Sequence, residues 1–243
     1  MGMLYVVGLG PGKASGRTAE AQAALEAADV LCGYTGYLEL LGTEFPDKET
    51  FSTPMTGELD RCRKALELAK SGKTVALVCS GDAGVYGMAS PLLECAEEYP
   101  DVDIEVVSGV TAATSGAALL GAPLGHDFCI ISLSDLLTPW EIIENRLQAA
   151  ASADFCIALY NPSSRRRQDY LERACAILLR SGKSPDTVCG WARNIGRDGQ
   201  TCGTCTLAEL VSFSADMFTT IYIGSSTTRL INGRMVTPRG YRK

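Results

Sequence analysis

The sequence predicts a soluble α/β protein built from two domains. Its 243 residues suit two domains of ordinary size better than one continuous core. Short apolar runs alternate with helical stretches along most of the chain, as in α/β proteins with parallel strands. The segment GAPLG at residues 121–125 interrupts this alternation and predicts a linker. We therefore expect an N-terminal α/β domain over residues 1–120 and a C-terminal α/β domain over residues 121–243.

The first half of the chain consists of repeated strand, loop and helix units. Short buried strands are expected at residues 4–7, 29–34, 74–79 and 104–107. Helices are expected between them at residues 18–28, 57–71 and 89–98. Parallel sheets of this kind bind ligands beyond the carboxyl ends of their strands. The loops that follow these strands are therefore the places where a binding site is expected.

The second half continues the alternation after the predicted linker. Strands are expected at residues 128–132, 155–160, 187–192 and 219–224. Helices are expected at residues 140–151, 166–181 and 207–211. This pattern predicts a second sheet that is also flanked by helices.

Composition and charge exclude several classes of function. The 28 acidic and 22 basic residues give a formal charge of -6, whereas a nucleic-acid binder concentrates lysine and arginine on one surface. No apolar stretch reaches the ~18 residues of a membrane span, and the N-terminus lacks the features of a signal peptide. The ten cysteines are scattered through predicted strands and helices, which suits reduced thiols. We expect a cytoplasmic protein without nucleic-acid or membrane partners.

The first glycine-rich loop, GLGPG at residues 8–12, matches a phosphate-binding loop only in part. Glycines after a strand let main-chain amides approach an anion closely. The loop lacks a third glycine at the dinucleotide-binding spacing, and Pro11 removes one amide donor. A tight turn without any ligand explains the loop equally well.

Two later loops carry more informative side chains. The segment SGDAGVYG at residues 80–87 places Asp82 among three glycines just beyond a predicted strand. A carboxylate at this place binds a ribose hydroxyl or an ammonium group, or it caps the next helix. The segment SGVTAA at residues 108–113 repeats the arrangement with hydroxyls and small residues. Such residues allow close contact with a flat ligand, or they simply begin a helix.

The chain contains one histidine, His126, which excludes a metal site with several histidine ligands. His126 is interpreted as a general acid or base, as an axial ligand to a metal in the substrate, or as a structural residue. Cys202 and Cys205 have CxxC spacing, but no second pair and no histidine cluster accompany them. We expect no resident metal site.

Taken in order, the three loops resemble those of the tetrapyrrole methylase family. The similar segments are VGLGPG at residues 7–12, SGD at residues 80–82 and SGVTAA at residues 108–113. The resemblance covers nearly the whole chain. Further segments resemble the branch of the family that methylates C17 of corrin precursors, and they lie at residues 121–128, 131–140, 159–165 and 194–197. Ala83 departs from the proline that many relatives have at this position.

The resemblance implies a two-domain fold in which each domain is a mixed sheet flanked by helices. The cofactor is expected in a cleft between the domains. The implied reaction transfers a methyl group from S-adenosylmethionine to C17 of precorrin-3B or cobalt-factor III, in cobalamin biosynthesis. This step is coupled to contraction of the macrocycle, which removes C20 from the ring path. The resemblance also implies a homodimer.

Individual residues follow from the same resemblance. Nine are expected to contact S-adenosylmethionine: Gly81, Asp82, Val85, Tyr86, Thr111, Ala112, Tyr160, Ala192 and Thr220. The first loop is expected at the floor of the substrate cleft, with four contacts: Gly10, Pro11, Gly12 and Arg17. Because the substrate carries many carboxylates, three further basic residues are candidates, with plain surface solvation as the alternative: Arg165, Arg193 and Arg197.

Methyl transfer from a sulfonium needs orientation more than acid or base groups, because the methyl group is already activated. Ring contraction adds proton movements, for which His126, Ser134 and Asp135 are the hypothetical groups. Three alternatives stay open: methylation of another macrocycle position, action on another substrate such as the diphthamide precursor on a protein, and tetrapyrrole binding without turnover. Whether the natural substrate contains cobalt is open as well.

Overall fold

The computed structural model describes residues 2–164 and 168–241. It divides into two compact units, Met1–Thr111 and Ala112–Lys243. The division falls between Thr111 and Ala112, whereas the sequence predicted it between residues 120 and 121. The intervening segment forms a helix that packs within the second unit, as described below.

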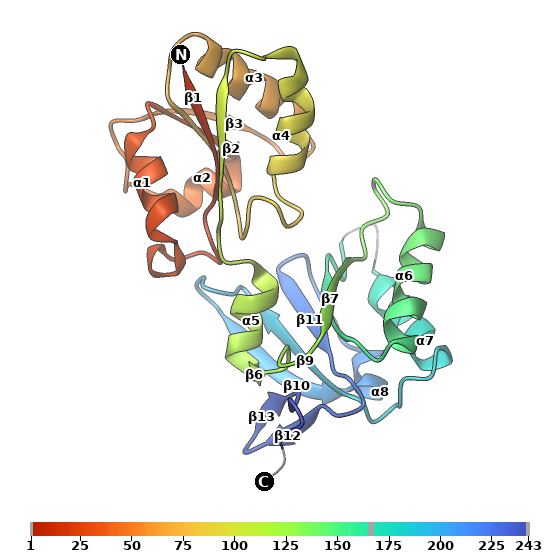
Figure 1. The fold of residues 1–243 in the computed structure, drawn as a ribbon. Helices are drawn as coiled ribbons and strands as arrows, with labels where there is room; N and C mark the ends of the chain where they lie inside the picture. Colours follow the sequence, from red (N-terminus) through yellow and green to blue (C-terminus); the bar gives the residue numbers. More distant parts are fainter. Residues whose placement is uncertain (1, 165–167, 242–243) are drawn as a thin grey trace. The chain divides into compact units, whose positions relative to one another are not determined.

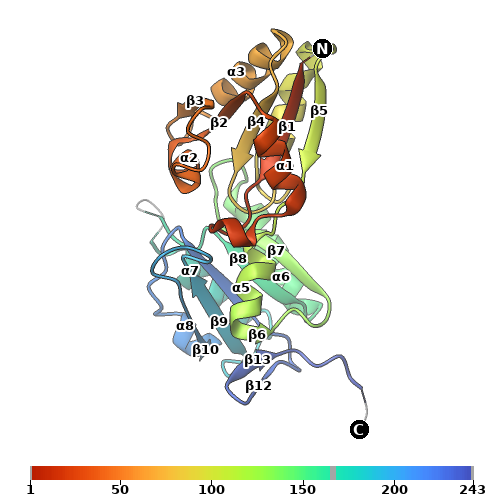
Figure 2. The same ribbon diagram turned by 90° about the vertical axis from the view of Figure 1, so that its left-hand side faces the viewer.

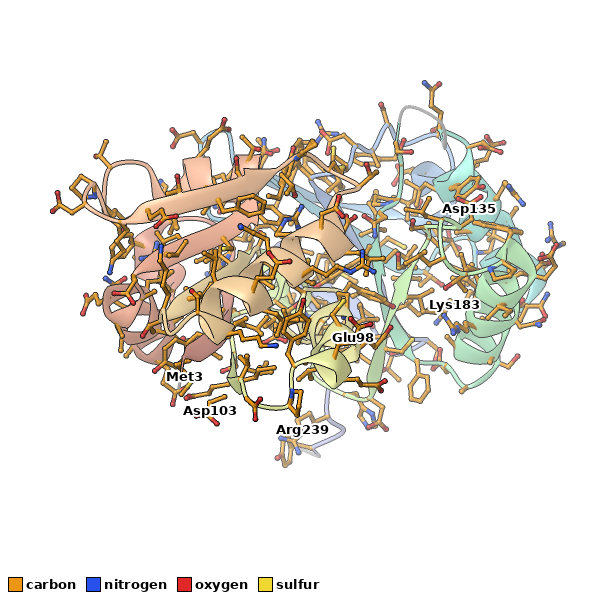
Figure 3. The ribbon with its side chains drawn as sticks, turned by 90° about the horizontal axis from the view of Figure 1, so that it is seen from above. Met3, Glu98, Asp103, Asp135, Lys183 and Arg239 are labelled. Carbon is orange, nitrogen blue, oxygen red and sulfur yellow. The ribbon has the colours of Figure 1, made fainter. Side chains whose placement is uncertain are left out.

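The first unit is built on a five-stranded sheet in the order β3-β2-β4-β1-β5. Its strands are β1 (Met3–Gly8), β2 (Val30–Tyr34), β3 (Glu49–Thr53), β4 (Val75–Cys79) and β5 (Asp103–Val107). Figure 3 shows Met3 and Asp103 side by side, where β1 and β5 begin their parallel pairing. Every pair in this sheet is parallel, so the expected mixed sheet is wrong for this unit. The sequence did not predict β3, because this edge strand is largely polar.

Helices cover both faces of the first sheet (Figure 1). One layer holds α1 (Ala19–Ala27) and α2 (Thr35–Leu41), and the other holds α3 (Glu58–Lys70) and α4 (Ala89–Cys95). Alternate residues of a strand point to opposite faces. Leu4 and Val6 therefore pack with α3 and α4, whereas Val7 packs with α1 and α2. Short 3-10 helices lie at Ala14–Gly16 and Ala96–Glu98.

The second unit has a five-stranded mixed sheet in the order β10-β9-β11-β8-β7. Its strands are β7 (Phe128–Ser132), β8 (Cys156–Tyr160), β9 (Val188–Arg193), β10 (Thr201–Thr206) and β11 (Thr219–Ile223). β7 and β8 are parallel, and the other three pairs are antiparallel. The mixed sheet expected for the second domain is therefore confirmed. β10 was not predicted, since the sequence TCGTCT lacks an apolar alternation.

Helix α5 (Ala112–Leu120) lies on one face of this sheet, and α6 (Trp140–Ser152) and α7 (Tyr170–Arg180) lie on the other (Figure 1). The short α8 (Leu207–Leu210) joins the core formed with α6 and α7. Three residues of α5, Ala113, Ala117 and Leu120, share a buried cluster with Ala158, Ala192 and Tyr222 of the sheet. This packing places α5 in the second unit and explains why the unit begins at Ala112.

A small three-stranded sheet completes the second unit (Figure 2). It contains β6 (Gly121–Ala122), β12 (Arg229–Ile231) and β13 (Arg234–Val236). The predicted linker at residues 121–125 is therefore partly a paired strand, because β6 hydrogen-bonds in parallel to β13. None of the helices in the described part of the chain has the length and apolar character needed to span a membrane.

Candidate functional site

Three loops meet at the carboxyl edge of the first sheet, because they follow the adjacent parallel strands β4, β1 and β5. Main-chain hydrogen bonds join the first two loops. The Gly10 amide donates to the Gly81 carbonyl oxygen at 3.0 Å, and the Gly81 amide donates to the Gly10 carbonyl oxygen at 2.8 Å. Two glycine-rich loops that are far apart in sequence thus form one pair.

Glycine is required where these loops approach one another. A Cβ atom on Gly109 would lie 2.1 Å from the Gly81 carbonyl oxygen and 2.6 Å from the Gly8 carbonyl oxygen. A Cβ atom on Gly8 would lie 2.7 Å from main-chain atoms of both Gly81 and Gly109. Gly10 also has a φ of +73°, which favours glycine. The packing of three main-chain segments therefore accounts for these glycines without a phosphate ligand.

Asp82 connects the second and third loops through its carboxylate. Its Oδ1 accepts hydrogen bonds from the amides of Gly84 at 2.8 Å and Val85 at 3.1 Å, and its Oδ2 accepts from the Gly109 amide at 3.0 Å. The first two bonds form a local turn, whereas the third is a link between loops. Oδ1 already accepts two hydrogen bonds, whereas Oδ2 retains capacity for one more donor.

The remaining candidates in these loops differ in exposure. Tyr86 adopts a left-handed φ of +53° and is exposed, which is unusual for an aromatic residue. Val85 and Thr111 are half-buried, and Gly81 is buried. The first unit therefore presents a carboxylate, a hydroxyl and an aromatic ring along one edge, beyond the ends of its strands.

In the second unit, strand register brings three predicted cofactor contacts into one row. Ala192 on β9 is paired with Thr220 on β11. Leu159 is paired with Ile221, which places Tyr160 next to Thr220 in the same register. Residues directly opposite one another on neighbouring strands share a face of the sheet. Tyr160, Thr220 and Ala192 therefore line the face that α5 covers.

Only one member of this row has a partly exposed side chain. Ala192 is 0% exposed and Thr220 is 5% exposed, whereas Tyr160 is half-buried. The Tyr160 hydroxyl oxygen accepts a hydrogen bond from the Ala113 amide at 2.7 Å. Contact between a ligand and this row must therefore involve Tyr160 or main-chain atoms at the strand ends.

A second tyrosine, Tyr222, holds the same turn of α5. Its hydroxyl donates to the Ala112 carbonyl oxygen at 2.7 Å, and the residue is fully buried. Burial, together with the nearby Tyr160, raises the pKa of Tyr222 and keeps its hydroxyl a donor. Tyr160 and Tyr222 thus fix the first turn of α5, which begins with the predicted cofactor residue Ala112.

The three residues hypothesised to assist ring contraction do not come together. Ser134 and Asp135 follow the carboxyl end of β7, whereas His126 precedes its amino end. A five-residue strand spans roughly 17 Å. The His126 side chain is 59% exposed, and its Nδ1 lies 3.4 Å from the carboxylate of the adjacent Asp127. β7 therefore separates His126 from Ser134 and Asp135.

Ser134 and Asp135 lie on the same edge as Tyr160. Ser132 is paired with Tyr160, and its hydroxyl accepts a hydrogen bond from the Ser134 amide at 3.2 Å. The Tyr170 hydroxyl donates to Asp135 at 2.5 Å, and this bond raises the pKa of Tyr170. Figure 3 shows Asp135 well separated from Lys183, which belongs to the opposite end of the sheet.

The predicted substrate contacts in the first loop are only partly accessible. Pro11 and Gly12 are half-buried, and Gly10 is buried. The Arg17 side chain is 2% exposed, and its Nη1 lies 2.6 Å from the Gln22 side-chain oxygen and 3.0 Å from Glu44 Oε2. Its Nε is buried without a hydrogen-bond partner. Arg17 is therefore held inside the first unit and is not a free surface cation.

The other basic candidates have separate roles or lie outside the description. Arg193 contacts Asp216 at 3.3 Å and donates to the Ser214 carbonyl oxygen at 2.8 Å. The Arg197 guanidinium lies 5.7 Å from the Phe218 ring centre. Arg165 lies outside the described residues. Arg193 is therefore paired within the second unit.

The CxxC pair does not form a chelating site. Cys202 is paired with Ala192 and contacts the Leu119 carbonyl oxygen of α5, whereas Cys205 is paired with Cys189 and packs with the opposite core. Residues three apart on a strand point to opposite faces. Within residues 2–164 and 168–241, no group of three or more histidine, cysteine or acidic residues is arranged to hold a metal ion.

Comparison with known proteins identifies the family. Residues 3–211 match the family model described as Tetrapyrrole (Corrin/Porphyrin) Methylases. The chain belongs to this family. The fold and the order of its loops therefore correspond to those of a tetrapyrrole methylase, as the sequence resemblance implied.

Two relatives of this methylase are similar over almost their full length. The chain is 46% identical over 240 residues to a protein of Salmonella typhimurium named probable cobalt-factor III C(17)-methyltransferase, covering 98% of this chain and 99% of that protein. It is 42% identical over 249 residues to the precorrin-3B C(17)-methyltransferase of a Sinorhizobium species, covering 99% and 97%. Two further relatives are longer proteins, of which this chain spans about half.

Solved structures agree with this family membership. The structure of the methyltransferase CobJ matches with a TM-score of 0.91 and 38% identity, over 98% of this chain and 100% of that chain. A uroporphyrin-III C-methyl transferase from Thermus thermophilus, complexed with S-adenyl homocysteine, matches with a TM-score of 0.70 and 20% identity, over 92% of both chains. The second match shows a shared fold.

Sequence reasoning missed two buried polar residues of this methylase, Tyr222 in β11 and Arg61 in α3. Tyr222 lies within an apolar strand, where it looks like any core residue, although the glycine at position 116 of α5 marks its opposing partner. Arg61 lies in α3 among the buried Cys62, Ala65 and Leu66. An arginine on the apolar stripe of a helix is an anomaly that a closer look at the sequence reveals.

Proposed function

We propose that this chain methylates C17 of a corrin precursor, either cobalt-factor III or precorrin-3B, in cobalamin biosynthesis. One observation carries the proposal: 46% identity across 99% of a relative named as a probable cobalt-factor III C(17)-methyltransferase. The 42% identity to a precorrin-3B C(17)-methyltransferase supports the same position of attack on the macrocycle. Contraction of the ring is part of the proposed reaction.

We propose S-adenosylmethionine as the cofactor, which when bound supplies an activated sulfonium methyl group. The S-adenyl homocysteine complex of a structure with the same fold supports this choice. The donor set at the edges of the two units fits such a group in kind. Asp82 offers acceptor capacity for hydroxyl or ammonium donors, and Thr111 offers a half-buried hydroxyl. Val85 and Tyr86 offer apolar surface for an adenine ring.

The buried cofactor candidates have a different proposed role. Gly81, Ala192 and Thr220 are buried, so they act by shaping the main chain at the ends of their strands. The Tyr160 hydroxyl oxygen accepts a hydrogen bond from the Ala113 amide in the first turn of α5. This bond positions the adjacent Ala112. Fixed positions of this kind favour a reaction that depends mainly on in-line orientation of two groups.

For ring contraction we propose Ser134 and Asp135 as the nearest groups that can move a proton. Both lie beyond the carboxyl end of β7, on the same edge as Tyr160. Asp135 is held by the Tyr170 hydroxyl, so the carboxylate has a fixed orientation. His126 lies beyond the opposite end of β7, and a direct role in the same step requires a different arrangement of this segment.

The first loop, with Gly10, Pro11 and Gly12, is proposed to contact the macrocycle through its partly accessible main chain. Arg17 is paired with Glu44, and its positive charge is proposed to attract the carboxylates of the substrate.

We also propose a homodimer located in the cytoplasm. Size-exclusion chromatography coupled to light scattering tests this proposal. The expected mass is twice the 25.8 kDa of one chain.

The decisive experiment measures turnover. The purified protein is mixed under anoxia with S-adenosylmethionine and either cobalt-factor III or precorrin-3B. We expect S-adenosylhomocysteine to form together with a tetrapyrrole that is one methylene heavier, and the faster substrate identifies the route. A shifted pigment spectrum without S-adenosylhomocysteine would identify a carrier. A product methylated elsewhere than C17, as determined by NMR, would identify another methylase of the family.

A further inference from the structure

Arg61 is a buried cation at the carboxyl edge of the first sheet. It lies in the first turns of α3 and is 3% exposed. Its guanidinium contacts Thr53 and Pro54, which end β3 and begin the next loop, and Met88, which precedes α4. Thr53 is paired with Tyr34, the last residue of β2, so Arg61 lies level with the strand ends. This is the edge that carries the three glycine-rich loops.

The hydrogen bonds of Arg61 are few for a buried guanidinium. Its Nε donates to Thr53 Oγ1 at 3.0 Å, and its Nη2 donates to the Pro54 carbonyl oxygen at 3.3 Å. The acceptor for Nη1 is the Met88 sulfur at 3.5 Å, which is a weak acceptor. A guanidinium has five N–H donors. All three acceptors are neutral, and one is poor.

The charge of Arg61 has no ion-pair partner in the described part of the chain. The acidic residues closest in sequence, Glu58 and Asp60, lie on exposed positions of the same helix. Asp82, in the loop after β4, is already bonded to three main-chain amides. Near a helix N-terminus the macrodipole also disfavours a cation. A buried and uncompensated charge is costly, and its presence here points to an anion that approaches this edge.

The loop above Arg61 adds an independent observation. Thr56 has a φ of +77°, which is strained for a β-branched residue. On either side of it, Met55 is 47% exposed and Leu59 is 53% exposed. Two exposed apolar side chains thus lie in the segment that leads from the Arg61 contact at Pro54 into α3. A flat apolar ring with acidic groups on its rim matches both features.

We propose that Arg61 is a positioning residue that draws the carboxylate rim of the tetrapyrrole substrate to the carboxyl edge of the first unit. This inference rests on the proposed function and names the side of the substrate that this edge recognises. Arg61 acts through the loop at residues 54–57 and through its electrostatic potential, because it is itself covered. A charge in such a low-dielectric place retains more of its potential than a surface charge does.

The test compares three variants: R61M, R61K and R63M. R61M removes the charge but keeps an unbranched apolar side chain, and R61K keeps the charge but loses the forked hydrogen bonds. R63M removes an exposed arginine two positions away on the same helix, so its net charge equals that of R61M. For each protein we measure kcat and KM with cobalt-factor III from about 50 mM NaCl, where screening is weak, to about 500 mM NaCl, where it is strong. The affinity for S-adenosylhomocysteine is measured by calorimetry.

We expect R61M to raise KM about tenfold at low salt and to reduce the salt dependence of kcat/KM. Its kcat and its affinity for S-adenosylhomocysteine stay within about twofold of the wild type, because Arg61 does not touch the reacting atoms. R61K keeps the salt dependence, and R63M behaves as the wild type. If R61M does not fold, R61K decides. The inference predicts that R61K keeps a KM and a salt dependence close to those of the wild type, whereas a purely structural role predicts a loss of substrate affinity because the forked hydrogen bonds are absent.

Two outcomes overturn the inference. One is an unchanged KM and an unchanged salt dependence in a folded R61M. The other is an equal loss in R61M and R63M, which would indicate only net charge. If the wild type binds S-adenosylhomocysteine and turns over cobalt-factor III, either outcome contradicts only the role of Arg61. A wild-type protein without turnover on either tetrapyrrole contradicts the proposed function as well.

Discussion

The two units build their candidate edges by different means. In the first unit, parallel strands end together, and the loops beyond them are joined by main-chain contacts among Gly8, Gly81 and Gly109. In the second unit, antiparallel pairing brings the start of β11 beside the end of β8, and side chains make the contacts. Tyr160 and Tyr222 there hold the first turn of α5. Main-chain packing tolerates no added atom, whereas side-chain packing can partly adjust.

The largest effect is expected from Gly109→Ala. The new Cβ would lie 2.1 Å from the Gly81 carbonyl oxygen, and neither main-chain segment can yield without separating the loops. We expect the free energy of unfolding to fall by at least about 2 kcal/mol, as measured by urea denaturation. Gly84→Ala is the matched control, because its Cβ would meet only Asp82 Oδ1 at 3.4 Å. Equal stability of the two variants would contradict the main-chain contact.

An intermediate effect is expected in the second unit from Gly116→Ala. The new Cβ would lie 2.2 Å from the Tyr222 hydroxyl oxygen, which is the end of a side chain. We expect a loss of about 1 to 2 kcal/mol, since the better helix propensity of alanine offsets part of the overlap.

Tyr222→Phe tests the same contact from the other side. Alone, it removes the bond to the Ala112 carbonyl oxygen and is expected to cost about 1 kcal/mol. Combined with Gly116→Ala, it removes the overlap, so the double variant loses less stability than the sum of the single variants. Additive losses in this cycle would show that Gly116 and Tyr222 are not in contact.

The sequence predicted most elements of both sheets but not their division. Apolar runs such as residues 128–132 coincide with observed strands, because buried strands carry a strong signal. β3 and β10 were missed since edge strands need few apolar residues. The unit boundary was misplaced because α5 consists of small residues, whose role is visible only when Ala113 and Ala117 are seen against the sheet.

The candidate site was predictable as a set of loops but not as a geometry. Glycines and Asp82 beyond predicted strands indicated the edge of the first unit, because parallel strands end together. The alignment of Tyr160, Thr220 and Ala192 depends on strand register, which no local pattern specifies. His126 and Ser134 are close in sequence, yet a whole strand separates them. Arg61 was missed although its place among the buried residues of α3 marks it, and its contact with Met88 depends on the tertiary fold.

The smallest effect is expected at the opposite end of the second sheet, where Asp154 accepts bonds from Ser226 and contacts Lys183 at 3.3 Å. Burial raises the pKa of Asp154, but the Ser226 and Lys183 contacts outweigh it, so the pKa lies below its usual 3.8. A carboxyl group with a lowered pKa stabilises the folded state above its unfolded pKa, and this contribution is lost as the pH falls through the folded-state value.

Asp154→Asn is therefore expected to lower stability at pH 7 by about 1 kcal/mol, a small value because the Asp154 side chain is 46% exposed. The difference from the wild type should shrink as the pH falls below about 4, as measured by urea denaturation at several pH values. Asp186→Asn, an exposed position in the same unit, is the control and should show little difference at any pH. A deficit in Asp154→Asn that is constant with pH would indicate lost packing instead.

The contact among Gly8, Gly81 and Gly109 has a consequence for redesign of the protein. Main-chain contacts and the Asp82 carboxylate hold these loops together. Near this contact, Val85 is half-buried, and Tyr86 and Val110 are exposed. A library that varies these positions and keeps the three glycines would select for new ligand preferences without changing the main-chain contact.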